Sequence, residues 1–240
     1  MKTIPLKYLK EDPGVGNADD STDARESTGM LERLVADLRG QLEALSPGAE
    51  ALRRADLELQ LGRALVRLEK GPEAWEAARK AFDLYLDEQA WEGAAQACDI
   101  LFLAEQPQSL SALGQGIWLA VTYPVDPELS VALLQHVVEE TPPDSDGAAV
   151  AAVTAYYLVD LRARDPQREH LLLYANQVLA TVARRHSGVD GQQAFDQWIG
   201  DMELNDPALF LPRLRNVVDV LVQDDWWFDR EALQAALPSD

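Results

Sequence analysis

Apolar residues recur along most of the chain at the spacing of a helix face. The first such stripe consists of Leu31, Leu34, Val35, Leu38, Leu42 and Leu45. These residues fall at i, i+3, i+4, i+7, i+11 and i+14, which is typical of one face of an amphipathic helix. The same period continues, with short polar breaks, to the end of the sequence. The pattern therefore predicts an all-α protein of about ten to eleven helices.

Three Asp-Pro pairs predict regular helix starts. Asp126-Pro127, Asp165-Pro166 and Asp206-Pro207 each place an N-cap carboxylate before a proline whose fixed φ suits the first helical position. The prolines lie 39 and 41 residues apart, a period typical of stacked helical repeats. Second helices are expected near Asp146 and Asp190. We therefore expect stacked antiparallel hairpins that form a short solenoid.

Small and aromatic residues between positions 73 and 142 follow a further pattern. One register contains Ala78, Ala81, Phe82, Tyr85, Trp91, Ala94, Cys98 and Leu101, and a second contains Leu113-Gly114, Ile117, Ser130, Leu134, Val137 and Pro142. In this spacing the stretch resembles the tetratricopeptide repeat, although the later period exceeds that family's roughly 34 residues. The resemblance implies a divergent TPR-like array and a noncatalytic interaction module. Such an adaptor, scaffold or assembly factor would bind a protein or peptide partner.

Residues 1–27 lack the helical period and are predicted to form a flexible N-terminal arm, followed by a single helical repeat domain over 28–240. The first ten residues carry a net charge of +3. Within them, Ile4, Leu6 and Tyr8 alternate as in a strand and are candidate partner-binding residues. They could add to a partner's sheet edge or lie on the acidic surface of this chain or a neighbouring subunit. Simple disorder is the alternative.

Large aromatic residues also cluster near the C-terminus, where Trp226, Trp227 and Phe228 stand between carboxylates. Terminal repeats of an array need a cap, so one interpretation is an acidic, Trp-rich lid over the last helices. The other interpretation is an anchor for a partner, because aromatic residues dominate interface hot spots. Trp226, Trp227 and Phe228 are therefore further candidate partner-binding residues.

The net charge of the chain limits the kinds of partner that it is expected to bind. With 41 acidic and 21 basic residues, the formal net charge is −20, which argues against direct binding of nucleic acids or anionic membranes. Residues 186–240 alone carry eleven acidic and three basic residues. This acidity could serve solubility, salt adaptation or docking of a partner with a basic surface. A second hypothesis, an acidic DNA mimic that regulates a nucleic-acid-binding protein, requires paired rows of carboxylates on one face.

Motifs that would carry chemistry are weak. Cys98, the only cysteine, excludes an intramolecular disulfide and is expected to be buried. His136 and Glu140 share a helix face, and a helical metalloenzyme built on them with carboxylates from other helices is a third hypothesis. We assign no catalytic, cofactor-binding or metal-binding residue. The sequence shows no targeting or membrane-spanning segment, so a cytoplasmic protein is expected, with its oligomeric state left open.

Overall fold

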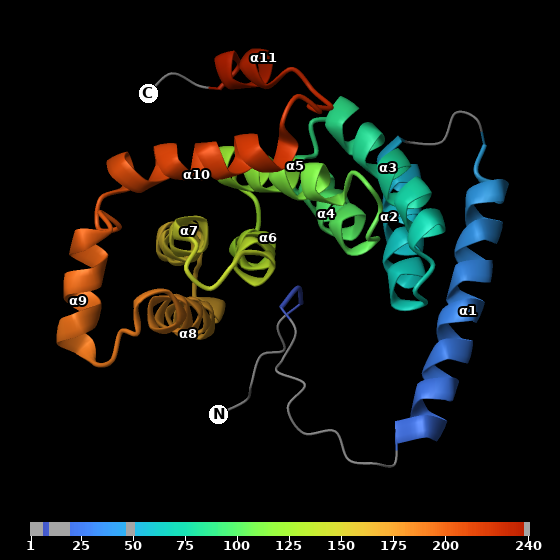
Figure 1. The fold of residues 1–240 in the computed structure, drawn as a ribbon. Coiled ribbons are helices and arrows are strands. Elements are labelled where there is room, and N and C mark those ends of the chain that lie inside the picture. The colour runs from blue at the N-terminus through green and yellow to red at the C-terminus, as the bar shows by residue number, and fades with distance from the viewer. Residues whose placement is uncertain (1–6, 10–19, 47–50, 238–240) are drawn as a thin grey trace. The chain divides into compact units, whose positions relative to one another are not determined.

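A computed structural model describes residues 7–9, 20–46 and 51–237 of the chain (Figure 1). In these residues it contains eleven helices and no strand. The helices are α1 (Asp20–Ala44), α2 (Ala51–Arg67), α3 (Gly71–Asp87), α4 (Trp91–Leu103), α5 (Ser109–Thr122), α6 (Pro127–Glu140), α7 (Asp146–Arg162), α8 (Gln167–Ser187), α9 (Gln192–Asp201), α10 (Pro207–Val222) and α11 (Arg230–Ala235). Consecutive helices pack in pairs, so the all-α prediction and its helix number are confirmed.

The chain divides into two compact units, whereas the sequence predicts one domain over 28–240. We call Lys10–Leu119 the inserted unit, because the other unit, the split unit, consists of Met1–Leu9 and Ala120–Asp240. The boundary near Leu119 lies inside α5. No linker or change of composition accompanies it, and for this reason the helical period alone does not reveal the division.

In the inserted unit, short turns join the helices. Glu69 and Gln89 occupy the turns after α2 and α3 with left-handed φ values of 56° and 55°. The next residue in each turn donates its backbone N–H to the preceding helix, from Lys70 to Leu65 at 2.9 Å and from Ala90 to Tyr85 at 2.8 Å. These bonds satisfy carbonyls that a helix end would otherwise leave open, so the backbone itself closes both hairpins.

Small residues let the helices of the inserted unit approach closely. A Cβ at Gly93 would lie 2.5 Å from the ring of Tyr85, and one at Gly71 would lie 2.5 Å from the carbonyl oxygen of Ala104. The helix contacts bury the side chains of Ala74, Ala77, Ala78, Ala81, Ala94, Ala95 and Ala97. The hydroxyl of Tyr85 donates to Asp56 at 2.6 Å. Packing here is therefore set by short approaches of backbone to backbone at Gly71 and of backbone to ring at Gly93.

In the split unit, α6, α7 and α8 lie side by side, α10 crosses α7, and α9 packs against α8 (Figure 1). Two of the predicted Asp-Pro caps are confirmed, since Asp126 accepts from the N–H of Glu128 and Asp206 from that of Ala208. The prediction for Asp165 is wrong. Its peptide bond to Pro166 is cis, and Pro166 itself holds the N-cap position without a side-chain cap.

The other predicted helix starts agree to different degrees. α7 begins at Asp146, as expected, and α9 begins two residues after Asp190. In contrast, α1 begins at Asp20, inside the segment predicted as an arm over 1–27. The helix therefore extends into a segment that has no apolar period.

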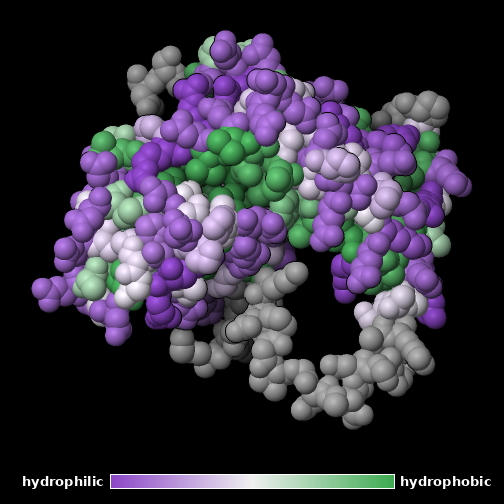
Figure 2. All heavy atoms as spheres, in the orientation of Figure 1, coloured by the Kyte–Doolittle hydropathy of each residue, from purple (hydrophilic) through white to green (hydrophobic). Residues whose placement is uncertain are grey.

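Hydrophilic residues predominate on the face of the molecule drawn in Figure 2, and hydrophobic residues form smaller patches on it. This agrees with the excess of acidic residues in the sequence. Among the described helices, none combines the length and the apolar character that crossing a bilayer requires.

Candidate functional site

A cavity of about 340 Å³ lies among α7, α8, α9 and α10 of the split unit. Its floor is apolar and buried, with Val153 and Leu179 on adjacent helices and Leu204 in the connection from α9 to α10. The volume is at the lower end of the range for ligand pockets in proteins, roughly 300–1,000 Å³. The cavity is therefore large enough for one bulky side chain or a small molecule.

Four aromatic rings line this cavity: Tyr156, Tyr157, Phe195 and Phe210. The rings of Tyr157 and Phe210 meet edge to face with centroids 5.8 Å apart. Aromatic pairs of this geometry are favourable and rigid, because the positive ring edge meets the negative ring face. This contact joins α7 to α10 and gives the cavity a fixed wall.

Polar groups stand among the rings of the cavity. The lining contains two exposed carboxylates, Asp160 and Asp196, and two exposed amides, Asn176 and Asn205. Arg168 donates to Oδ1 of Asp160 at 2.5 Å, and Gln192 donates to Oδ1 of Asp196 at 2.7 Å. The lining residues themselves include no lysine or arginine. Asp160 is thus paired with a cation, whereas Asp196 receives a neutral amide, so the negative charge of the lining lies mainly at Asp196.

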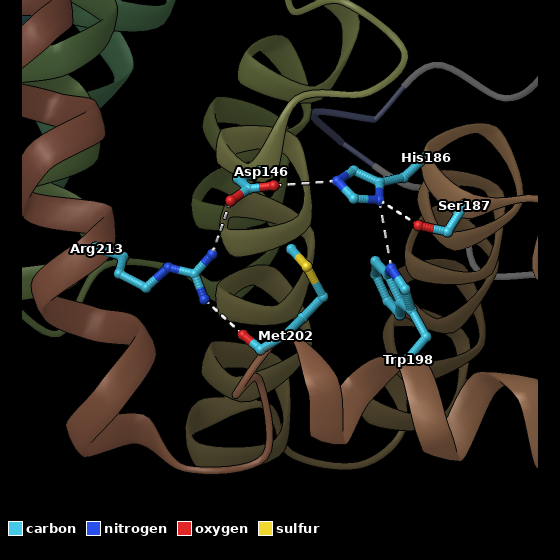
Figure 3. Close-up of polar contacts among 6 residues, drawn as sticks. All are labelled: Asp146, His186, Ser187, Trp198, Met202 and Arg213. Carbon is cyan, nitrogen blue, oxygen red and sulfur yellow. Dashed lines mark hydrogen bonds and ion pairs between the residues drawn. The ribbon is translucent and has the colours of Figure 1, made fainter.

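Beside the cavity, a polar junction ties four helices of the split unit together (Figure 3). His186 at the end of α8 contacts Asp146 at the start of α7 through Nε2, at 3.1 Å, and Ser187 through Nδ1, at 2.6 Å. The indole N–H of Trp198 on α9 also points to Nδ1, at 3.4 Å. An indole nitrogen can only donate, so Nδ1 accepts and Nε2–H donates to Asp146.

Arg213 of α10 completes the junction. Its guanidinium lies 3.5 Å from Asp146 and donates to the carbonyl oxygen of Met202 at 2.6 Å (Figure 3). The carbonyl of Met202 lies at the C-terminal end of α9, where cationic donors are favoured. Arg213 therefore links α7, α9 and α10 at one point.

Serine, histidine and aspartate meet in this junction, as they do in hydrolase triads. Three features favour a structural role instead. Trp198 shares the Nδ1 atom with Ser187, Arg213 neutralises Asp146, and neither Ser187 nor His186 lines the cavity. We therefore interpret the cluster as a support for the cavity wall, since the ring of Trp198 also lies 6.0 Å from that of Phe195.

The structure describes only one of the three N-terminal candidates. Ile4 and Leu6 lie outside the described residues, whereas Tyr8 is half-buried in the split unit. The backbone N–H groups of Tyr8 and Leu9 both donate to Oε1 of Glu128, and Gln167 donates to its Oε2 at 2.8 Å. Glu128 is only 1% exposed and lies in the first turn of α6, where the helix dipole also favours its charge. Residues 7–9 therefore lie on their own chain, one of the placements expected for the arm.

The C-terminal candidates lie in the connection between α10 and α11. Trp226, Trp227 and Phe228 are all half-buried, and the rings of Trp226 and Phe228 pack with centroids 5.6 Å apart. The guanidinium of Arg230 stands 4.6 Å over Trp226 and donates to Asp219 at 2.6 Å. Arg230 thus links Trp226, and through it Phe228, to α10 and α11, an arrangement compatible with both a lid and an anchor.

The remaining chemical candidates are His136 with its neighbouring carboxylates, and Cys98. Within the described ranges no group of three histidine, cysteine, aspartate or glutamate side chains is arranged to hold a metal ion. His136 lies 3.9 Å from Glu139, its neighbour at i+3. Cys98 is fully buried in the inserted unit, as expected, and burial raises the pKa of its thiol. Its nucleophilic thiolate is therefore disfavoured.

Sequence reasoning missed the cavity because its lining comes from four helices and one connection. One local signal was present: Tyr156 and Tyr157 are the aromatic residues of α7, whose other apolar residues are aliphatic. Phe195 and Phe210 fit ordinary helix stripes and gave no such signal.

Comparison with family models, curated protein sequences and solved structures gives no match to this chain. Function must therefore be inferred from the chemistry of the site, because a fold alone does not define an activity. For this chain the cavity of the split unit, its polar rim and the junction that supports it are the features to interpret.

Proposed function

We propose that this protein is a noncatalytic interaction module, an adaptor, scaffold or assembly factor of TPR-like character, that binds a protein or peptide partner in the cytoplasm. The observation that carries the proposal is the cavity among α7, α8, α9 and α10, which combines a buried apolar floor with an exposed polar rim. Protein interfaces place their anchors in pockets of this kind, with an apolar centre surrounded by polar groups.

The lining of the cavity suits binding better than catalysis. It contains no serine, cysteine, histidine or lysine that could act as a nucleophile or general base. Its two carboxylates, Asp160 and Asp196, are already engaged by Arg168 and Gln192. What the cavity offers a ligand is shape, aromatic surface and negative charge.

A capture experiment tests the proposal. The tagged full chain is used to recover partners from the cells of origin, followed by mass spectrometry, in parallel with Asn176→Trp, which fills the cavity from α8. Binding through the cavity predicts one dominant partner whose recovery falls at least tenfold with Asn176→Trp. Equal recovery by a variant with unchanged circular dichroism would contradict this site.

The C-terminal rings are tested in the same experiment. Trp226→Ala/Trp227→Ala removes two of the three rings, including one member of the Trp226–Phe228 pair, without touching the cavity lining. Loss of the partner with this variant alone would assign the anchor to Trp226 and Trp227 instead of the cavity. Addition of duplex DNA addresses the DNA-mimic hypothesis, because a partner whose basic groove is occupied would be released by DNA.

A further inference from the structure

The geometry of the cavity points to one class of ligand. Building on the proposed function, we infer that the cavity accepts a bulky apolar side chain of a partner segment in which that residue is flanked by arginine or lysine. The apolar side chain would lie on the floor formed by Val153, Leu179 and Leu204. The flanking cations would lie at the rim, on Asp196 and beside Asp160, which they would share with Arg168.

The floor of the cavity requires an apolar group. Val153, Leu179, Leu204 and Phe210 are between 2% and 6% exposed and present hydrocarbon surface to the cavity. A charged group placed there would lose its hydration without gaining a buried partner, which is strongly unfavourable. A leucine or aromatic side chain would instead remove apolar surface from water on both sides.

The rim of the cavity requires positive charge. Asp160 on α7 and Asp196 on α9 are exposed, but Asp160 forms an ion pair with Arg168, whereas Asp196 accepts only from the neutral amide of Gln192. The negative charge that a ligand would meet at the rim therefore lies mainly at Asp196. A cation near such a rim raises the rate of association and selects against acidic partners. The wider surface agrees, because residues 186–240 carry eleven acidic and three basic residues.

Other ligand classes fit less well. An acidic segment would be repelled by Asp196, and an entirely apolar segment would cover this carboxylate without compensating its charge. A small amine would satisfy the rim and leave the floor unfilled. The combination of an apolar centre with basic flanks is the chemistry that matches both parts of the cavity.

The walls of the cavity are held before any ligand binds. Phe195 packs on Trp198, Trp198 contacts His186, and His186 is fixed by Asp146 at the start of α7. On the opposite side, Tyr157 packs against Phe210. A preformed site does not have to order its side chains on binding, which lowers the entropic cost of association.

Fluorescence anisotropy with synthetic peptides tests the inference. The probe is a labelled peptide with one leucine flanked on each side by two arginines, measured against the full chain at low and physiological salt. We expect saturable binding that weakens at higher salt. Replacing the leucine by alanine, or the arginines by glutamates, should each weaken binding at least tenfold. Equal binding of all three peptides would overturn the inference.

Protein variants locate the binding. Asp160→Asn/Asp196→Asn should weaken the arginine-containing peptide at least fivefold and reduce its dependence on salt. The matched control is Asp190→Asn/Asp201→Asn, which removes two exposed carboxylates that lie outside the lining. Asn176→Trp should abolish binding of the leucine-centred peptide. If the control variant weakens binding as much as the rim variant, the peptide binds to general surface charge and the inference is wrong.

The outcomes also separate this inference from the proposed function. A captured partner that depends on the cavity, combined with absence of peptide binding, would retain the interaction module and reject this ligand class. The peptide could instead bind specifically while no captured partner is sensitive to Asn176→Trp. This result would retain the ligand chemistry of the cavity and reject the proposed function, in which a protein partner binds through it. Competition between the peptide and the captured partner for the same variant-sensitive site supports both.

Discussion

The inserted unit and the split unit bring their helices together by different means. In the inserted unit, Gly71 and Gly93 allow backbone and ring to approach within the space of a methyl group. In the split unit, long polar side chains such as Arg162, Arg185 and Arg213 reach across to carbonyl groups on other elements. Alanines are nevertheless buried in α7 as well as in α3 and α4, so the difference between the units is the added set of arginine bridges. The cavity lies among the bridged helices α7, α8, α9 and α10.

Removing a close approach should have the largest effect. Gly71→Ala places a Cβ 2.5 Å from the carbonyl oxygen of Ala104, so a backbone segment must move. We expect a loss of about 3 kcal/mol in the free energy of unfolding, measured by urea denaturation. The control is Gly40→Ala in α1, where nothing lies within 4 Å of the new Cβ. That variant should gain about 0.5–1 kcal/mol, because alanine favours a helix over glycine.

Removing a bridge should have the next largest effect. The guanidinium of Arg162 donates to the carbonyl oxygens of Ala120 and Val121 near the end of α5, the latter at 2.8 Å. Arg162→Ala should therefore cost about 2 kcal/mol, as measured by urea denaturation. Arg184→Ala, at an exposed position of α8, serves as the control and should change stability by less than about 0.5 kcal/mol. Equal effects of the two variants would show that the bridge made by Arg162 does not stabilise the split unit.

A smaller effect is expected from the segment at residues 7–9. Tyr8→Pro removes the backbone N–H that donates to Glu128, while Tyr8→Ala keeps it. The proline variant should be about 1.5 kcal/mol less stable than the alanine variant, because a buried carboxylate loses one donor. Thermal unfolding of the two variants measures the difference. Identical melting temperatures would show that this contact adds nothing to the split unit.

The smallest effect concerns a buried carboxylate of the inserted unit. Burial raises the pKa of Glu58 above its ordinary value of 4.5, against the attraction of Lys80 and Arg54. Ionisation of Glu58 at pH 7 therefore lowers the free energy of unfolding, and Glu58→Gln should be slightly more stable than the parent at this pH. As the pH falls through the raised pKa, the parent becomes protonated and the advantage disappears, fully so below pH 4.5.

The matching change in the split unit sharpens this last comparison. Glu128 is also buried, but it accepts from Tyr8, Leu9 and Gln167. Glu128→Gln should therefore destabilise the protein at pH 7, opposite in sign to Glu58→Gln. Urea midpoints measured at pH 7, 5 and 4 test the predictions for Glu58→Gln and Glu128→Gln. A stabilising effect at both positions would mean that burial outweighs hydrogen bonding in each unit.

The sequence predicted the features that depend on local order. The apolar period and the N-cap residues predicted where helices lie, including the start of α7 at Asp146 and the caps at Asp126 and Asp206. It failed at Asp165, where the same dipeptide lies before α8 without capping it. The division into two compact units has no counterpart in the sequence pattern, because its boundary falls inside the continuous helix α5.

The site was harder to predict than the fold. Tyr157 and Phe210 lie 53 positions apart, and His186 and Asp146 lie 40 apart, so only the fold brings them together. The candidates chosen from the sequence, such as Trp226 and Tyr8, were instead noticeable because neighbouring residues formed a local pattern. Their role as partner-binding residues stays a prediction.

The contact between Tyr8 and Glu128 spans 120 positions and has a consequence for synthesis. Tyr8 and Leu9 leave the ribosome before Glu128, because their acceptor is made only after the whole inserted unit has been translated. At about 5–20 residues per second, this delay is roughly 6–24 s. During this interval the inserted unit can fold, while residues 7–9 of the split unit do not yet have their acceptor, Glu128. The order of translation therefore makes Tyr8 and Leu9 available to other molecules in the nascent protein, and withdraws them once α6 is complete.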